Sequence, residues 1–232
     1  MTIKIISWNI LHIVHEFNYV EKDSLVINEY PNELARMEKI LEVINNEIIN
    51  NEEIIVNLQE VPGDYLEKLI SSYKENIYFY TYSRIPTLKT LMTVPYKNMK
   101  ESLVSIVKVN QKVLGQTFID FYKGKAALIL KFASYELYNV HLPIKYDKVI
   151  KIEHNAIIVG DFNCNQFNAL KIFHNCAACE NYENTHIIKK NNQIILSALD
   201  HILYKGIKIK KIAHVEKSNL SDHYPIYTYI YE

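Results

Sequence analysis

Cysteine is scarce in this sequence, and the patterns that mark secreted or membrane-spanning proteins are missing. The 232 residues include three cysteines, Cys164, Cys176 and Cys179, an odd number in a chain too long to depend on disulfides. No stretch approaches the roughly 20 apolar residues that cross a bilayer, and the first apolar run is too short and interrupted for a signal peptide. We therefore expect an intracellular protein in a reducing compartment, cytoplasmic by default, with no membrane span.

Net charge and flexible linkers are also missing. The 26 lysines and arginines equal the 26 aspartates and glutamates, so a polyanion must be bound by a local patch and not by the field of the whole protein. With 5 glycines and 6 prolines, no repeat, low-complexity block or linker divides the chain. Because 49% of the residues are hydrophobic, the chain can bury an ample core. Residues 1–232 are predicted to form a single domain, and the protein is predicted to be a monomer.

Hydrophobic spacing predicts helices near the amino end and strands along most of the remaining chain. Amphipathic helices are predicted at 32–48 and after Pro62, with the apolar stripes Leu34, Met37, Leu41, Ile44, Ile48 and Leu66, Leu69, Ile70, Tyr73. Strands are predicted at 3–8, 54–58, 77–82, 102–109, 116–121, 125–132, 135–140, 157–159, 194–196, 199–204, 207–213 and 224–230. A loop at 11–30 and a brief helix at 166–175 complete the pattern. It indicates an α/β (α+β) fold in which two mostly antiparallel sheets pack face to face, with helices outside.

Polar side chains recur at the ends of the predicted strands. They are Asn9, Glu60, His141, Asp161 and Asn163, together with Asp200 at the start of one strand and Asp222-His223 just before the last. Side chains at the ends of adjacent strands converge on one rim, where a rigid scaffold holds them. Because carboxylate and amide oxygens dominate this set, it suits Mg²⁺, with Mn²⁺ as the alternative, whereas zinc would require more histidine or cysteine.

Each of these residues also has an ordinary structural explanation. Asn9 alone is typical of a turn, and Glu60 alone could face solvent or favour the amino end of the next helix. Residues 160–163 could be a turn that caps the helix at 166–175, and a lone His141 is more often structural than catalytic. Their joint occurrence, in this order along the chain, favours a shared site.

Six segments between residues 7 and 226 form a series. They are Ser7-Trp8-Asn9-Ile10, Leu58-Gln59-Glu60-Val61, Asn139-Val140-His141-Leu142, Gly160-Asp161-Phe162-Asn163, Leu199-Asp200-His201-Ile202 and Ser221-Asp222-His223-Tyr224-Pro225-Ile226. In this order they resemble the endonuclease/exonuclease/phosphatase superfamily, the metal-dependent phosphodiesterases that include DNase I and exonuclease III. The resemblance implies a four-layer α/β/β/α sandwich of the DNase I type, in agreement with the predicted strands and helices.

The resemblance also implies roles for individual residues. It places a Mg²⁺ ion at Asn9 and Glu60, with Asp222 nearby to support His223 or a second metal. Asp161 would orient and deprotonate the attacking water, and Asn163 would steady the phosphate beside it. His223, bonded to Asp200, and His141 would both contact the scissile phosphate.

Phosphodiester chemistry supports these roles independently of the family. Negative charge develops on the phosphate oxygens during attack, and a divalent metal and cationic donors stabilise it. A histidine paired with an aspartate keeps one tautomer and favours the imidazolium form, so His223 can donate to phosphate at neutral pH. Asp161 can act as a base if its surroundings raise its pKa or if the metal acidifies the water, and the sequence leaves both routes open.

Two positions depart from the family pattern. Leu11 lies two places after Asn9, where many relatives carry an acid, so metal binding is expected to be weaker or limited to one ion. The interval from His141 to Asp161 is short where relatives fit a substantial helix, and residues 145–154 leave room only for a trimmed one.

Substrate class stays open at this point. Trp8-Asn9-Ile10-Leu11 and Arg36 show a weaker likeness to the deadenylase and nocturnin branch, which acts on poly(A) RNA or related phosphoesters. Lys125 could contact substrate phosphate or simply lie on a turn. The leading hypothesis is a nuclease that cleaves RNA or DNA. The alternatives are a hydrolase of a small phosphoester (an inositol phosphate, sphingomyelin or a modified nucleotide) and a non-catalytic binding module, which the complete residue set disfavours.

Two further patterns have simpler explanations. Lysines between 205 and 217 alternate with Ile207 and Ile209, which is more typical of a strand with one solvated face than of a nucleic-acid track. Cys176 and Cys179 lie near two histidines, His174 and His186, but the second cysteine pair of a zinc site is missing, so buried thiols are favoured.

Overall fold

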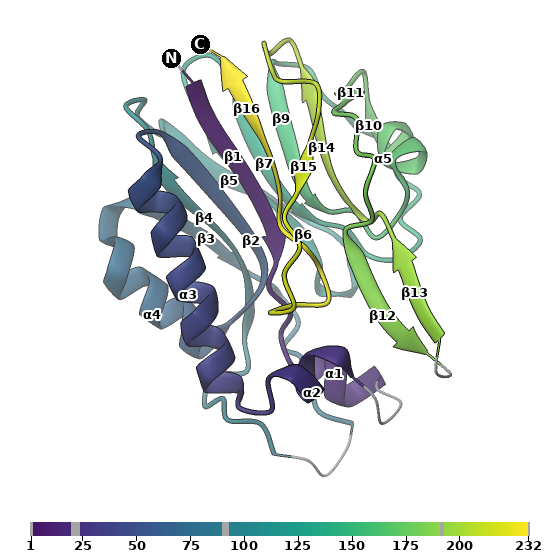
Figure 1. The fold of residues 1–232 in the computed structure, drawn as a ribbon. Coiled ribbons are helices and arrows are strands. Elements are labelled where there is room, and N and C mark those ends of the chain that lie inside the picture. Colours follow the sequence, from purple (N-terminus) through teal and green to yellow (C-terminus); the bar gives the residue numbers. More distant parts are fainter. Residues whose placement is uncertain (1, 20–23, 90–92, 191–192, 232) are drawn as a thin grey trace.

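Two six-stranded sheets form the centre of the fold (Figure 1). The computed structural model describes residues 2–19, 24–89, 93–190 and 193–231. The first sheet contains, in spatial order, β15 (His214–Val215), β16 (Ile226–Tyr231), β1 (Thr2–Asn9), β2 (Ile54–Pro62), β4 (Glu101–Lys108) and β3 (Ile77–Thr81). The second contains β11 (Ala177–Ala178), β14 (Asp200–Lys205), β9 (Ala156–Asp161), β7 (Glu136–His141), β6 (Ala126–Lys131) and β5 (Gly115–Asp120). Within these sheets β1 pairs with β2 and β7 with β9 in parallel, and the other neighbours are antiparallel.

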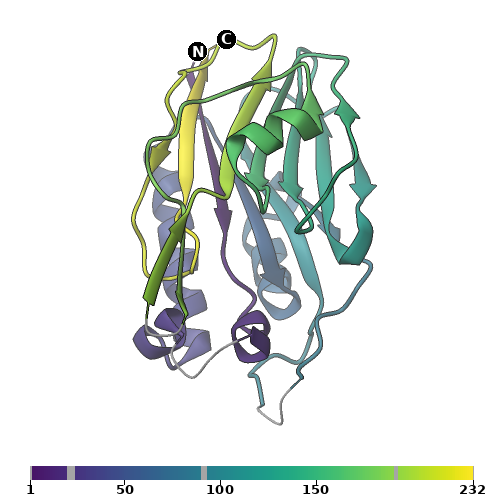
Figure 2. The same ribbon diagram turned by 90° about the vertical axis from the view of Figure 1, so that its right-hand side faces the viewer.

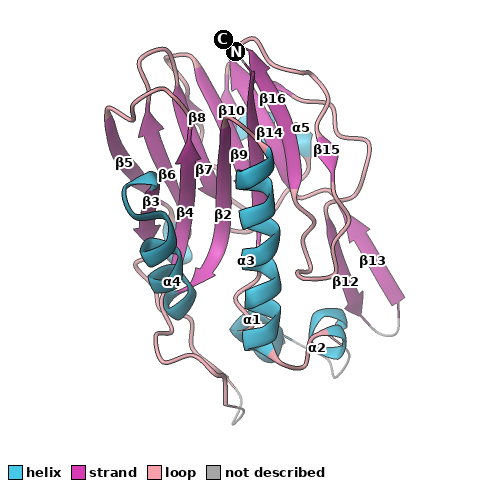
Figure 3. Ribbon diagram, turned by 60° about the vertical axis from the view of Figure 1, so that its left-hand side comes forward, coloured by secondary structure: helices cyan, strands magenta, loops and turns pink. Residues whose placement is uncertain are grey.

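Helices cover the outer faces of the two sheets. α3 (Glu33–Asn50) and α4 (Gly63–Tyr73) lie on the first sheet, and α5 (Gln166–Ile172) lies on the second (Figures 2 and 3). Buried apolar side chains form one cluster between the sheets, one between the first sheet and its helices, and one between the second sheet and α5. A smaller fourth cluster contains Leu11, Ile13, Val26 and Tyr96. This four-layer α/β/β/α sandwich with mostly antiparallel sheets confirms the predicted fold class.

The α3 helix begins where the sequence predicts, although its buried face is rotated. Asn32 caps the helix, since its side-chain oxygen accepts a hydrogen bond from the Ala35 amide at 3.1 Å. Met37, Ile40 and Ile44 are buried, whereas Leu34, assigned to the apolar stripe, is 56% exposed. The first turn instead buries Glu33 and Arg36, so the apolar stripe begins one turn later than predicted.

Several short elements differ from the sequence-based expectation. The segment 11–30 contains α1 (Val14–Tyr19) and α2 (Leu25–Glu29), so the prediction of a loop is wrong there. Helices of five or six residues are too short to show a repeated apolar period. In the interval before Asp161, the described chain forms β8 (Ile150–Lys151), paired with β10 (Phe173–His174), and no trimmed helix.

The carboxyl-terminal third also contains an additional ribbon. β12 (His186–Lys190) pairs with β13 (Gln193–Ser197) outside the two large sheets, and only the second of these strands is predicted. The strand predicted at 207–213 is not a regular strand, since it makes only isolated bridges at Ile209 and Ile212. Two 3₁₀ turns, Lys74–Asn76 and Tyr122–Gly124, complete the described structure.

Alternation along β1 explains how a buried strand delivers a polar side chain to the space between the sheets. Successive side chains of a strand point to opposite faces. Ile3 and Ile5 belong to the cluster between the sheets, while Ile6 and Trp8 belong to the cluster under α3. By the same alternation Asn9, the last residue of β1, faces the second sheet.

A layer of hydrogen-bonded polar residues follows the apolar core between the sheets. Gln59 of β2 donates to Asn139 of β7 at 2.7 Å and to the Ser7 hydroxyl at 3.2 Å. Ser105 of β4 donates to Asn57 at 2.8 Å. All five side chains are fully buried. The interior thus changes from apolar to polar toward the end at which Asn9 and Asp161 lie.

No helix in the part of the chain that the structure describes is long and apolar enough to cross a membrane. The three cysteines are free thiols. The cytoplasmic setting stays a prediction.

Candidate active site

Strand register aligns three of the sequence-predicted residues in one row of the second sheet. Asp161, the last residue of β9, lies opposite Asp200 on β14 and opposite His141 on β7. Gly160 precedes Asp161 with φ 146°, and a Cβ atom there would lie 1.9 Å from the Val140 carbonyl oxygen. Glycine is therefore required for β9 to approach β7 this closely beside the site.

Two asparagines hold the Asp161 carboxylate. Asn9 donates from Nδ2 to Asp161 Oδ2 at 3.1 Å, across the two sheets. Asn163 donates its backbone N–H to Oδ1 at 2.8 Å and lies 3.3 Å from Oδ2 through its side chain. Asn163 has φ 50°, a left-handed conformation that asparagine tolerates, and Asn165, not Asp161 or Asn163, caps α5. The alternative in which residues 160–163 serve as a helix cap is therefore wrong.

The Asp161 carboxylate is buried and more basic than an exposed aspartate. Burial raises its pKa to about 6, with a further contribution from the charge on Asp200, against the lowering effects of His223 and the Asn163 amide. Asp161 is 2% exposed. A carboxylate with a pKa near 6 is ionised at neutral pH and is a stronger base than an exposed aspartate.

His223 forms a buried dyad with Asp200. Their Nδ1 and Oδ2 atoms are 2.8 Å apart, and the Thr185 hydroxyl donates to the same carboxylate oxygen at 2.7 Å. Burial disfavours the imidazolium, but Asp200, Asp161 and Asp222 outweigh it and raise the pKa of His223 well above its ordinary value. The other ring nitrogen, Nε2, lies 3.8 Å from Asp161 Oδ2. His223 therefore presents an N–H to the position beside Asp161.

The tautomer of His141 follows from its neighbours. Its Nδ1 lies 2.9 Å from the Tyr82 hydroxyl and 3.3 Å from Lys125 Nζ. A lysine ammonium can only donate, so Nδ1 accepts and the ring proton is on Nε2. Burial and the charge of Lys125 keep the pKa of His141 well below its ordinary value, so the ring is neutral. Nε2 faces Asp161 Oδ2 at 3.4 Å and Glu60 Oε1 at 3.6 Å.

Glu60 reaches the site through a break in the register of β2. The pairing with β4 shifts between Leu58 and Val61, and Glu60 has φ 58°, so its side chain leaves the regular alternation. Its carboxylate accepts a hydrogen bond from the His12 amide at 3.2 Å. Burial opposes ionisation, but the charges of His15 and Lys125 prevail and lower the pKa of Glu60 to about 2.

Glu101 and His15 adjoin Glu60, and sequence reasoning missed both. Glu101 opens β4 and is 2% exposed. His15 Nε2 lies 2.8 Å from Glu101 Oε2 and 3.7 Å from Glu60 Oε2. Lys125 Nζ lies 3.3 Å from Glu60 and 3.5 Å from Glu101, so it neutralises carboxylates within the site and is not merely a turn residue. The available signal for Glu101 was an acid at the head of a strand antiparallel to β2.

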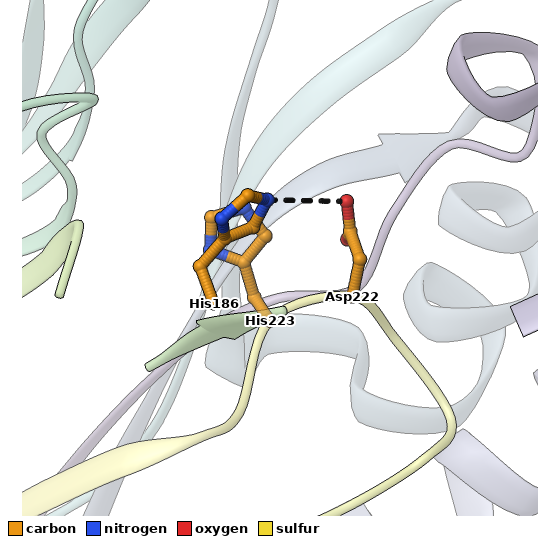
Figure 4. A group of neighbouring side chains, drawn as sticks. All are labelled: His186, Asp222 and His223. Atoms are coloured by element: carbon orange, nitrogen blue, oxygen red, sulfur yellow. Dashed lines mark ion pairs between the residues drawn. The ribbon is translucent and has the colours of Figure 1, made fainter. Parts of the chain in front are cut away.

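Asp222 lies beside two histidines. Figure 4 shows Asp222 beside His186 and His223, with the His186 ring against the His223 ring. His186 Nε2 lies 3.7 Å from Asp222 Oδ2, and the two ring centroids are 4.5 Å apart. His186 comes from β12, and its Nδ1 lies 2.9 Å from the Ser197 hydroxyl. The β12–β13 ribbon thus contributes a side chain to the site that sequence reasoning considered only for zinc.

The residues present fit a divalent metal on the basis of their donor chemistry. Three groups of ligand-type side chains are found among the described residues, and in each the donor atoms lie within 4.8 Å of one another. The groups are His186-Asp222-His223, His15-Glu60-Glu101 and Asp161-Asp200-His223. Each contains at least one carboxylate, as a hard divalent cation requires, and none contains a cysteine. The described structure therefore does not support the Cys176/Cys179 zinc alternative.

Solved structures match the chain over its full length, although no protein-family model and no curated protein sequence matches it. TDP2 from D. rerio, complexed with single strand DNA product, is 14% identical with a TM-score of 0.61, covering 100% of this chain and 99% of that one. An endonuclease/exonuclease/phosphatase from Bacteroides vulgatus is 12% identical (TM-score 0.63; coverage 100% and 99%). ANGEL2, described as a 2',3'-cyclic phosphatase, is 11% identical (TM-score 0.65; coverage 99% and 95%). The chain has the endonuclease/exonuclease/phosphatase fold.

Within this fold, residues from the six sequence motifs lie close to Asp161. Asn9, His141 and His223 lie 3.1, 3.4 and 3.8 Å from the Asp161 carboxylate. Glu60 lies 3.6 Å from His141. His201, the neighbour of Asp200 in its motif, points instead to the Cys164 carbonyl at 2.8 Å. Most of these motif residues therefore surround Asp161, whereas His201 bonds to the backbone outside that cluster.

Proposed function

We propose that the chain, acting as one domain of residues 1–232 and as a monomer, is a metal-dependent phosphodiesterase that hydrolyses phosphodiester bonds in RNA or DNA. The observation that carries this proposal is the surroundings of Asp161. A buried carboxylate with a raised pKa lies between two amide donors and two imidazole Nε2 atoms. This combination provides a base for water and N–H donors for the phosphate within one small volume.

Asp161 and the two histidines have different proposed roles in hydrolysis of the phosphodiester. Asp161 accepts the proton of the attacking water, and Asn9 and Asn163 keep its carboxylate oriented. The imidazolium of His223 donates from Nε2 to a non-bridging phosphate oxygen, while Asp200 holds the opposite ring nitrogen. Neutral His141 donates from its own Nε2, because Nδ1 is occupied as an acceptor.

A divalent metal is expected at Glu60, whose carboxylate is ionised and buried. When bound, the ion would supply positive charge to the phosphate and leaving oxygens. Asn9 is less available than the sequence suggested, because its amide already bonds both Asp161 and the Leu11 backbone. Asp222 lies with His186 and is proposed to support His223.

One structural relative supports nucleic acid as the substrate class, and a second supports a phosphoester more generally. The D. rerio TDP2 structure contains a single strand DNA product, and ANGEL2 is described as a 2',3'-cyclic phosphatase, a name that indicates action on a phosphoester. With a net charge of zero, contacts with a polyanion must be local.

A substrate panel tests the proposal. Single- and double-stranded DNA, poly(A), mixed RNA, RNA with a 2',3'-cyclic phosphate end, inositol phosphates and sphingomyelin are incubated with Mg²⁺, Mn²⁺ or EDTA. We expect nucleic-acid cleavage that EDTA abolishes and that Asp161→Asn and His223→Ala lower by at least about 100-fold, the lower range for a positioned acid or base.

The matched control is Asp147→Asn, an exposed aspartate that should leave the rate unchanged. Cleavage of the small phosphoesters alone would overturn the nucleic-acid assignment. No cleavage of any compound with either metal would overturn catalysis and favour a binding module.

A further inference from the structure

The metal site contains side chains beyond those that the sequence motifs supply. After Asn9 the chain turns through Leu11, whose φ of 59° is left-handed, and enters α1. This turn brings His15 back against Glu60 and Glu101, at 3.7 and 2.8 Å. Leu11 itself is 3% exposed and lies in the core. Leu11 thus stands where many relatives carry an acid, and His15, four residues later, lies beside the Glu60 carboxylate.

The spacing of the three donor atoms suits one coordination sphere. Ligand atoms about 2.1 Å from an octahedral ion lie about 3.0 Å apart when adjacent and about 4.2 Å apart when opposite. The two distances from His15 Nε2, 2.8 and 3.7 Å, bracket the adjacent spacing, and all three donors lie within 4.8 Å of one another. An ion can therefore be enclosed with side-chain shifts of well under 1 Å, about the tolerance of a preorganised site.

Two observations indicate that the cluster is built to hold a cation. Glu60 and Glu101 are 7% and 2% exposed, and a pair of buried carboxylates is costly unless positive charge lies between them. Lys125, at 3.3 and 3.5 Å, and the charged His15 ring supply this charge, and a divalent ion held by His15 Nε2 would displace the ring proton. In addition, His12 is fully buried in the same loop, its backbone N–H donates to Glu60, and its Nε2 has no hydrogen-bond partner in the described chain. The loop that carries His15 therefore also holds a buried polar atom without a partner among the described residues.

We propose that Glu60, Glu101 and His15 form a single divalent-metal site that takes a nitrogen-accepting transition ion such as Mn²⁺ in preference to Mg²⁺. Carboxylates accept Mg²⁺ and Mn²⁺ alike, but an imidazole ligand favours transition ions over Mg²⁺, which strongly prefers oxygen. His15 is thus the residue that sets the metal preference. Only the assignment of this ion to catalysis rests on the proposed function. Binding of the ion to the site can be tested without substrate.

Metal binding to the full chain gives the first measurement. Isothermal titration of the metal-stripped protein with MnCl₂ and with MgCl₂ is expected to show tighter binding of Mn²⁺. His15→Gln should weaken Mn²⁺ binding at least about 10-fold, since even loss of a group that orients a ligand costs 10–100-fold. Binding of Mg²⁺ should change far less, so the Mn²⁺ preference should shrink. Glu101→Gln should weaken both ions.

Electron spin-echo spectroscopy of the Mn²⁺-loaded protein gives the second measurement, because it detects nitrogen bound to the ion. We expect a ¹⁴N modulation in the wild type that disappears in His15→Gln and persists in His174→Gln, an exposed histidine on β10 that serves as the control. Circular dichroism confirms that each variant is folded.

A ¹⁴N signal that is absent from the wild type, or that survives in His15→Gln, would overturn the inference. An Mn²⁺-to-Mg²⁺ affinity ratio unaffected by His15→Gln would overturn it as well. A protein that binds Mn²⁺ as described but cleaves no phosphodiester would leave the metal site standing and overturn only the proposed function.

Discussion

Arg36 tests how the site is held together. Its guanidinium is fully buried at the start of α3 and donates to the carbonyls of Ile10 (2.9 Å), Leu11 (2.8 Å) and Leu220 (2.5 Å), and to Glu33 (2.6 and 2.7 Å). Two of these carbonyls directly follow Asn9, and the third precedes the Ser221-Asp222-His223 segment. One side chain therefore fastens two site loops to a helix. We expect Arg36→Met to lower both stability and activity.

The magnitude follows from what the substitution leaves behind. Three buried carbonyls lose their donor, at about 1–3 kcal/mol for each acceptor that finds no other partner. The Glu33 carboxylate, 7% exposed, loses its cation, and breaking such a buried pair costs about 3–5 kcal/mol. These contributions are not additive, because water can reach some of the freed groups. We expect the free energy of unfolding to fall by about 4 kcal/mol or more, a large share of the 5–15 kcal/mol typical of a domain.

Urea unfolding followed by tryptophan fluorescence measures this loss of stability close to the two site loops. Trp8 is the sole tryptophan, is 2% exposed, and donates from Nε1 to the His223 carbonyl at 3.0 Å. Arg84→Met, at an exposed arginine, is the control and should stay within about 0.5 kcal/mol of the wild type. The double variant Arg36→Met/Glu33→Gln should recover about 1–3 kcal/mol, because no charge is stranded. A loss below about 1 kcal/mol in Arg36→Met, or no recovery in the double variant, would refute the reasoning.

Three further results are expected. The acid limb of kcat/KM for nucleic-acid cleavage, measured at saturating metal, should rise with pH up to about 6, because Asp161 must lose its proton to accept one from water; a limb near pH 4 would contradict the raised pKa. The alkaline limb reports loss of the His223 proton, which Asp200 stabilises. Asp200→Asn should therefore shift this limb about 1–2 units to lower pH, since a hydrogen bond to a charged group is worth about 1.5–3 kcal/mol and one pKa unit is about 1.36 kcal/mol. An alkaline limb that does not move would contradict the His223–Asp200 dyad. Gly160→Ala should destabilise the protein by about 4 kcal/mol or more in thermal unfolding, while Gly115→Ala, with no atom within 4 Å of the added Cβ, should be nearly neutral; similar melting temperatures for the two variants would argue against the close approach of β9 and β7.

The positions of the catalytic-type residues were predictable because they come directly after buried strands. Asn9 and Asp161 end apolar runs, and period-two alternation assigns both to the face between the sheets. Their 3.1 Å contact requires only that the two sheets pack face to face with these ends together. The alternation of residues along each strand and the face-to-face packing of the sheets were therefore sufficient to predict the positions of Asn9 and Asp161.

His15 and Glu101 could not be placed in the same way. Glu101 faces the site because β4 pairs with β2 antiparallel, in a register that includes a shift beside Glu60. His15 arrives through a left-handed residue, Leu11, and a helix of six residues. Apolar periodicity reports neither the register of a distant pair nor a single positive φ. The short helices and β12 were missed for the same reason, and His186 on β12 was considered only for a zinc site.

The polar layer between the sheets links the stability of the fold to the geometry of the site. Asn139 accepts from Gln59 at 2.7 Å and donates to the Leu58 and Val104 carbonyls at 3.2 and 2.9 Å, so it joins β7 to both β2 and β4. Leu58 lies two residues before Glu60, and Asn139 lies two residues before His141. A buried network of this kind is favourable only when its members are paired, so it fixes one relative position of the sheets. That position sets the 3.6 Å separation of Glu60 and His141. The buried strands β2 and β7 therefore contribute residues both to the core and to the candidate site.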